Sequence, residues 1–220
     1  MTDRKFEIKE HYTFDDLVAL LALLRSPEGC SWDRAQDHHS IRTCLLEECY
    51  EALEGIDNDD PALLGEELGD LLLQVVFHAR ISEEKGGFSI DEVADGVCKK
   101  MVRRHPHVFG NEKADTPGIV RESWEEIKKK EKGTSSVHEN MERVAKTLPS
   151  LIRTQKLLSK AEKGGFAEPC SNPGDERQLM KDYFDLCARA NALGVSLEEM
   201  AYRANGEYIK TIAKKEEEKK

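Results

Sequence analysis

The segment 66–81, EELGDLLLQVVFHARI, constrains the fold more than any other part of the chain. Its length, its leucine and valine content and its lack of proline predict a helix. On a wheel of about 100° per residue, apolar side chains form two faces with a narrow polar seam between them. One face carries Leu64, Leu68, Leu71, Leu72, Val75 and Ala79, the other Leu73, Phe77 and Ile81, and the seam Glu67, Asp70, Gln74 and His78. Acids flanked by apolar surface on both sides are expected to lie inside the protein.

Ionised carboxylates buried without partners are costly, so such acids protonate, pair with cations or bind metal. The preceding segment 40–56 predicts a second helix and carries three acids, Glu47, Glu48 and Glu51. The short connection DNDDP favours antiparallel packing, which would set Glu48 and Glu51 against Glu67 and Asp70. Oxygen ligands suit Mg²⁺ or Mn²⁺ better than zinc. A solvent-exposed acidic face remains the alternative.

Composition narrows the class of protein. The chain has 35% charged residues and a formal net charge of -10, which argues against nucleic-acid binding because that function needs a basic surface. No apolar run reaches the roughly 18 residues of a membrane span, and the N-terminus has no secretory pattern. The six cysteines are widely spaced, which favours reduced thiols. We therefore expect a cytoplasmic protein that binds neither membrane nor nucleic acid.

Helical periodicity dominates the chain and strand signals are scarce, so the sequence predicts an all-α fold. Thr13 and Ser89 are suitable N-caps for two of the expected helices. Two more helices are expected at 143–163 and 176–213. Residues 26–33 and 134–141 read as a loop and a polar linker.

Two acidic segments carry a resemblance to a known family. LEECYEALEGI followed by EELGDLLLQVVFHARI resembles the MazG family of nucleoside triphosphate pyrophosphohydrolases, whose pattern is EExxE, a gap and ExxD. The match continues upstream in CSWDRAQDHHSIR, where Ser31 replaces the proline of the CPWD loop, and downstream in KKMVRRHPHVFG. It covers roughly residues 10–130 and implies a MazG-like helical bundle that forms dimers.

The resemblance implies a metal-dependent reaction that splits a nucleoside triphosphate into a monophosphate and pyrophosphate, with broad base specificity. In this chain the expected metal ligands are Glu48, Glu51, Glu67 and Asp70, with Mg²⁺ as cofactor and Mn²⁺ as a substitute. Glu47 is the expected carboxylate for orienting the attacking water, and Glu66 is the alternative.

Substrate binding needs positive charge for the phosphates and a surface for the base. Lys100, Arg103 and Arg104 lie within about one helical turn and are the expected phosphate ligands. Trp124 matches a tryptophan that family members place near the nucleotide, so the resemblance implies that it stacks on the base; Trp32 is a weaker candidate. A solvated basic helix is the alternative reading of the cluster.

The chain is expected to contain a catalytic domain, residues 1–130, and a linker with a degenerate second repeat, residues 131–220. Residues 143–213 resemble a second MazG copy, but Gln178 and Lys181 stand where its ExxD acids would be, and a lysine repels a cation. The two-sided apolar helix favours a homodimer, although the C-terminal remnant could cover the second face. A non-catalytic nucleotide- or alarmone-binding module and a pure interaction protein remain the other functional classes.

Overall fold

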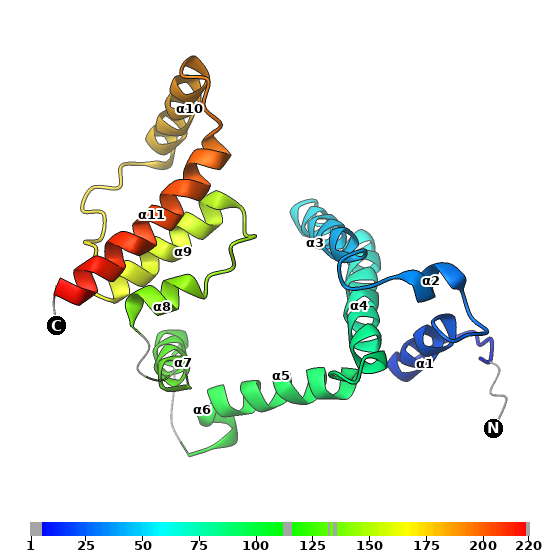
Figure 1. Ribbon diagram of the computed structural model, residues 1–220. Helices are drawn as coiled ribbons and strands as arrows, with labels where there is room; N and C mark the ends of the chain where they lie inside the picture. The colour runs from blue at the N-terminus through cyan, green and yellow to red at the C-terminus, as the bar shows by residue number, and fades with distance from the viewer. Residues whose placement is uncertain (1–5, 112–115, 132, 134–135, 219–220) are drawn as a thin grey trace. The chain divides into compact units, whose positions relative to one another are not determined.

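The computed structural model describes residues 6–111, 116–131, 133 and 136–218 of the chain. All regular secondary structure in these ranges is helical, which confirms the predicted all-α fold (Figure 1). The chain divides into two compact units, 1–121 and 122–220, and each has a hydrophobic core of its own.

The helices of the first unit are α1 (Phe14–Leu24), α2 (Ser31–Ala35), α3 (Arg42–Asp57), α4 (Pro61–Glu84), α5 (Ile90–Arg104) and α6 (Pro106–Phe109). Helix α7 (Pro117–Glu131) contains the boundary between the units. Thr13 with Asp16 and Ser89 with Glu92 form capping boxes, which confirms both predicted N-caps.

Helices α3 and α4 form an antiparallel hairpin (Figure 1). The Asp60 side chain accepts hydrogen bonds from the amides of Ala62 and Leu63, and Pro61 occupies the first helical position. The two backbones approach closely at Gly55, where a Cβ atom would lie 2.8 Å from the amide nitrogen of Leu64. Any larger residue at this position would push the two helices apart.

The core of the first unit lies where α1 and the start of α3 pack on α4. Its buried residues are Leu21, Ile41, Val76, Phe77 and Ile81. The opposite apolar face of α4 is not covered, because Leu68, Leu72 and Val75 are 52%, 41% and 41% exposed. Within the first unit this second face stays open, and its cover by a partner chain or by the C-terminal remnant stays a prediction.

The helices of the second unit after α7 are α8 (Val137–Glu142), α9 (Ser150–Lys163), α10 (Glu176–Ala192) and α11 (Leu197–Glu218). Helix α11 packs against α8 and α9 (Figure 1). The core residues are Met141, Val144, Leu157, Ala161, Ile209 and Ile212. The Glu216 carboxylate fixes α8 to α11 by accepting from the amides of Val137 and His138.

Several predicted boundaries were wrong. The described part of the expected linker, from Ser136 onward, includes α8, whose capping box and fully buried Met141 were hidden by its polar composition. Helix α2 begins inside the expected loop, extends two residues beyond it, and is too short to show periodicity. The expected helix 143–163 begins at Ser150, and 176–213 is broken near Gly194, whose φ of 63° is left-handed.

None of the helices in the described ranges has an apolar stretch long enough to cross a lipid bilayer.

The core of the first unit can be tested at Ile81, which is fully buried on α4. We expect Ile81→Ala to lower the free energy of unfolding by about 2–5 kcal/mol, because it removes packed atoms and leaves a cavity. Leu193→Ala is the control, since Leu193 is 77% exposed and such changes usually stay within about 0.5 kcal/mol. Urea unfolding followed by circular dichroism measures both. Equal effects of the two substitutions would contradict the assigned core.

Candidate functional site

Three carboxylates converge between α3 and α4. Glu48 of α3 and Glu67 and Asp70 of α4 each offer an oxygen atom, and these atoms all lie within 4.8 Å of one another. Glu67 is 8% exposed, and the other two side chains are half-buried. Because the donors are all carboxylate oxygens, this group, called here the carboxylate trio, could hold a hard divalent cation.

Burial and mutual repulsion both act on the two glutamates of the trio, and no cation of the described residues offsets them. Burial raises the pKa of the Glu67 carboxyl group, and the charges of Glu51 and Glu48 raise it further. Burial likewise raises the pKa of Glu48, with added repulsion from Asp70 and Glu51. A bound cation would relieve this repulsion, so the residues present fit a metal ion.

The other predicted acids surround the trio. Glu51 is exposed and outside the trio, but its charge acts on both Glu48 and Glu67, so it lies close to the group. Glu47 and Glu66 are also exposed and contribute smaller repulsions to their chain neighbours. The structure therefore brings the four predicted metal ligands into one region, with Glu51 at its edge.

The polar seam of α4 continues beyond the trio. Gln74 is 8% exposed, and its Oε1 atom has no hydrogen-bond partner within the described part of the chain. His78 lies one turn further along, with its Nδ1 atom 2.8 Å from Nδ1 of His38 and the two rings stacked. One of these nitrogens must carry a proton and the other must not. Burial, followed by the His38 charge, lowers the pKa of His78, which favours the neutral form.

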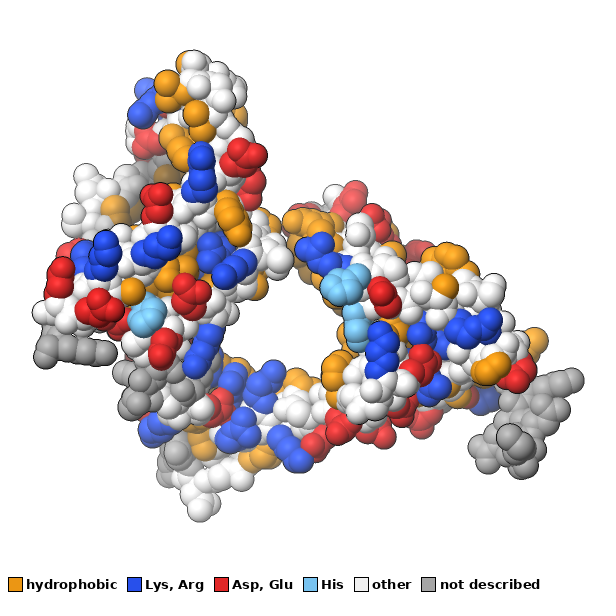
Figure 2. All heavy atoms as spheres, viewed as in Figure 1, with side chains coloured by type: hydrophobic (Ala, Val, Ile, Leu, Met, Phe, Trp, Pro, Cys, Tyr) orange, Lys and Arg blue, Asp and Glu red, His pale blue; other side chains and the backbone are white. Residues whose placement is uncertain are grey.

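The predicted phosphate ligands lie apart from the trio in the single chain. Asp70 lies 14 residues before the end of α4, which is about 21 Å of helix, and Lys100 lies 10 residues into α5, about 15 Å. The two helices diverge from their connection (Figure 1), and basic side chains gather over the far part of α5 (Figure 2). Arg103 and Arg104 lie in the last turn of α5. The expected phosphate ligands and the trio are therefore not neighbours within one chain.

The two predicted aromatic ligands differ in their surroundings. Trp32 lies on α2 in the first unit, and its side chain is 64% exposed. Trp124 lies on α7 in the second unit and is half-buried. Of the two, Trp32 belongs to the same compact unit as the trio.

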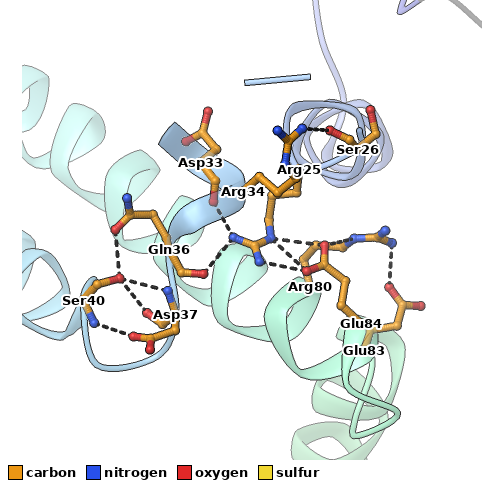
Figure 3. A network of polar contacts seen from close by, with 10 residues as sticks. All are labelled: Arg25, Ser26, Asp33, Arg34, Gln36, Asp37, Ser40, Arg80, Glu83 and Glu84. Carbon is orange, nitrogen blue, oxygen red and sulfur yellow. Dashed lines mark hydrogen bonds and ion pairs between the residues drawn. The ribbon is translucent and has the colours of Figure 1, made fainter. Parts of the chain in front are cut away.

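Sequence reasoning missed an ion-pair network at the end of α1. Arg25 is only 7% exposed and binds the Glu84 carboxylate with two of its nitrogens, at 2.8–3.2 Å (Figure 3). Arg25 follows the last residue of a leucine-rich helix. A charged residue beside an apolar face was the one local signal that it could be buried and paired. Its partner is 59 residues away and carries no local signal at all.

The comparisons with known proteins agree with this geometry. A family model described as the MazG nucleotide pyrophosphohydrolase domain matches residues 36–109, which include the whole trio. A Thermotoga maritima protein named nucleoside triphosphate pyrophosphohydrolase/pyrophosphatase MazG is 36% identical over 223 residues, covering 93% of this chain and 86% of that protein.

Two further relatives, from Escherichia coli K12 and Mycobacterium tuberculosis, are named nucleoside triphosphate pyrophosphohydrolase. They are 39% and 40% identical over 153 residues, or 69% of this chain. The match spans 58% and 45% of their own lengths, so the chain covers about half of each. The extent of the Thermotoga match and the family model confirm the resemblance seen in the acidic motifs: this chain belongs to the MazG family of nucleotide pyrophosphohydrolases.

Proposed function

We propose that this protein hydrolyses nucleoside triphosphates to nucleoside monophosphates and pyrophosphate, using divalent cations held between α3 and α4. The observation that carries the proposal is the carboxylate trio, whose oxygens lie within 4.8 Å and whose glutamates have raised pKa values. The names of the relatives from Thermotoga maritima and Escherichia coli support the same reaction.

The trio and the adjacent Glu51 hold the metal, which we propose to be Mg²⁺, with Mn²⁺ as a substitute. A bound divalent ion supplies charge neutralisation on the triphosphate oxygens and lowers the pKa of water. Glu47 orients the attacking water and accepts its proton, with Glu66 as the alternative for this role. Both are exposed beside the trio, where a water molecule has access.

Basic and aromatic side chains bind the remainder of the substrate. Lys100, Arg103 and Arg104 contact the phosphates, since arginine and lysine pair well with phosphate oxygens. Trp32 and Trp124 stack on the base. Stacking tolerates different bases, because every base has an aromatic face, so broad base specificity is expected.

The functional assembly is a homodimer. Large apolar side chains of α3 and α4 are about half exposed in the single chain: Leu46, Tyr50, Leu53, Ile56, Leu68, Leu72 and Val75. Figure 2 shows hydrophobic side chains at the surface over α3. A contiguous exposed apolar surface beside an active site is typical of a protein interface. A second copy covering it would also provide basic residues that the single chain does not bring to its own trio.

Residues 131–220, which belong to the second unit, form a linker and a degenerate MazG repeat. Gln178 and Lys181 lie on α10, at the positions expected for the second ExxD pair. Neither side chain offers a carboxylate, and the lysine would repel a cation. We propose that this unit lacks activity and contributes packing surface.

The cellular setting follows from chemistry. All six cysteines are free, which suits a reducing compartment, and we place the protein in the cytoplasm. Its formal net charge of -10 argues against nucleic-acid partners. A module that binds a nucleotide without hydrolysing it is the second candidate, because it would keep the same acids, and pyrophosphate release separates the two.

Turnover tests the proposal directly. We expect Asp70→Asn to lower pyrophosphate release from a panel of triphosphates with Mg²⁺ by at least about a hundredfold, because the acid holds the ion in the transition state. Glu54→Gln is the matched control, an exposed acid of α3 outside the trio, and it should retain activity. Full activity of Asp70→Asn would exclude the metal site. Binding without turnover by the unmodified protein would favour the second candidate.

The metal site also predicts a change in stability. The raised pKa of Glu67 means that the folded state holds its proton to higher pH, so stability falls as pH rises through that range. Without metal, Glu67→Gln should therefore raise the melting temperature at neutral pH, and this gain should shrink towards pH about 4. Saturating Mg²⁺ should stabilise the unmodified protein and the Glu54→Gln control but not Glu67→Gln. An equal Mg²⁺ shift in all three would contradict the site.

The dimer is tested by mass in solution. The chain has a mass of 24.9 kDa, and we expect light scattering after gel filtration to give twice this value. Leu72→Glu should shift the mass to that of one chain, because it places a charge on the uncovered face of α4. Leu193→Glu, on another exposed leucine, is the control. A dimer that survives Leu72→Glu would place the interface elsewhere.

A further inference from the structure

The Arg25 guanidinium connects the end of α1 to two other parts of the first unit. Its Nε and Nη2 atoms donate to the Glu84 carboxylate of α4. Its Nη1 atom donates to the carbonyl of Asp33 and, at 3.1 Å, to that of Gln36 (Figure 3). The same guanidinium lies over the Phe77 ring, 5.3 Å from its centroid. One buried cation thus holds three chain segments at a single point.

These carbonyls belong to α2 and the turn after it, so Arg25 binds the segment that carries Trp32. Residues 31–40 are called here the Trp32 segment. Asp33 lies within α2 and Gln36 is its C-cap, and the carbonyls at the C-terminal end of a helix favour a nearby cation. The Gln36 side chain also donates to the carbonyl of Trp32 at 2.9 Å. The Trp32 backbone is therefore fixed, while its indole side chain stays exposed.

A second contact ties the far end of the Trp32 segment to the seam that carries the trio. His38 forms a hydrogen bond with His78 on α4. His78 lies on the same seam as Asp70, eight residues or about 12 Å of helix away from it. The segment is thus anchored to α4 at Glu84 through Arg25 and at His78 through His38. His38 itself lies in a turn from Asp37 to Ser40 that is closed by its own hydrogen bonds.

We propose that Arg25 is a positioning residue for substrate binding: it fixes the Trp32 segment against α4 so that the exposed indole is pre-ordered for the nucleoside. The inference rests on the proposed function, because it assigns Trp32 to the substrate of that same site. Arg25 itself touches no substrate. Each of its three guanidinium nitrogens already donates to a protein partner.

The chemistry of the network requires arginine at this position. The planar guanidinium has five donors in a fixed fork, which allows it to bind a carboxylate and two carbonyls together. A lysine keeps the charge but presents one compact ammonium group, which cannot reach all of these partners. Arg25→Lys should therefore retain the pairing with Glu84 and loosen the Trp32 segment, whereas Arg25→Met should lose both.

The kinetic consequence separates binding from chemistry. None of the carboxylates in the trio contacts the network, so the rate of the chemical step should be preserved. An indole that must be ordered during binding weakens the complex. We expect Arg25→Met to raise KM for a nucleoside triphosphate about tenfold with kcat within about twofold, and Arg25→Lys to give a smaller rise in KM.

Arg80→Met is the matched control. Arg80 donates to the same Glu84 carboxylate, at 2.9 Å, and to Glu83, at 3.1 Å, and within the described part of the chain it has no hydrogen bond to the Trp32 segment. It therefore removes an ion pair of Glu84 without releasing the segment. The control should leave KM within about twofold of the unmodified protein.

Tryptophan fluorescence reports the position of the segment without relying on turnover. The chain has two tryptophans, so Trp124→Phe leaves Trp32 as the only reporter. In this background, Arg25→Met should lower the steady-state anisotropy of Trp32, and Arg80→Met should not. Circular dichroism checks that each variant is folded, and Arg25→Lys carries the test if Arg25→Met does not fold.

The outcomes separate this inference from the proposed function. A rise in KM together with lower Trp32 anisotropy in the Arg25 variants alone supports the inference. Unchanged anisotropy, a loss confined to kcat, or equal effects of the Arg25 and Arg80 variants overturns it. If the unmodified protein releases no pyrophosphate, the proposed reaction fails, and the inference is then decided by affinity for a non-hydrolysable ATP analogue. Equal affinities of Arg25→Lys and the unmodified protein would overturn it.

Discussion

The repulsion between carboxylates at the α3–α4 hairpin is the constraint on which the rest of the first unit depends. Three acidic side chains with oxygens within 4.8 Å raise the free energy of the metal-free protein, as the raised pKa values of Glu48 and Glu67 show. Packing elsewhere must offset this cost. The close backbone approach at Gly55 and the apolar core on the other side of α4 keep the two helices in place. The site is therefore built on rigid elements rather than on loops.

The arrangement explains how one helix serves both packing and chemistry. Along α4, the buried side chains Phe77 and Ile81 belong to the core, Glu67 and Asp70 to the trio, and Leu72 to an uncovered apolar face. These three functions occupy different sides of the same helix. An α-helix completes one turn every 3.6 residues, so side chains a few positions apart in the sequence point in different directions. A partner on the uncovered face would lie close to the acids, which links the proposed assembly to the proposed reaction.

Much of the fold was predictable because its signals are local. The periodicity of α4, the caps Thr13 and Ser89, and the i, i+3 spacing of the acids all appear within a few residues of one another. The short helices α2 and α8 were missed because their stability comes from contacts with distant elements. Met141 of α8, for example, is buried against α9 and α11, and no pattern near it in the sequence indicates this.

The sequence by itself determined the all-α class and the family membership, and it indicated which acids share one face, because helical period and motif spacing are properties of consecutive residues. Only the tertiary structure decided that Arg25 meets Glu84 across 59 residues, that His38 pairs with His78, and that the basic end of α5 lies away from the trio. It also decided which apolar face of α4 is covered. These features depend on how helices pack, and side chains far apart in the chain carry no mutual pattern that local chemistry could reveal.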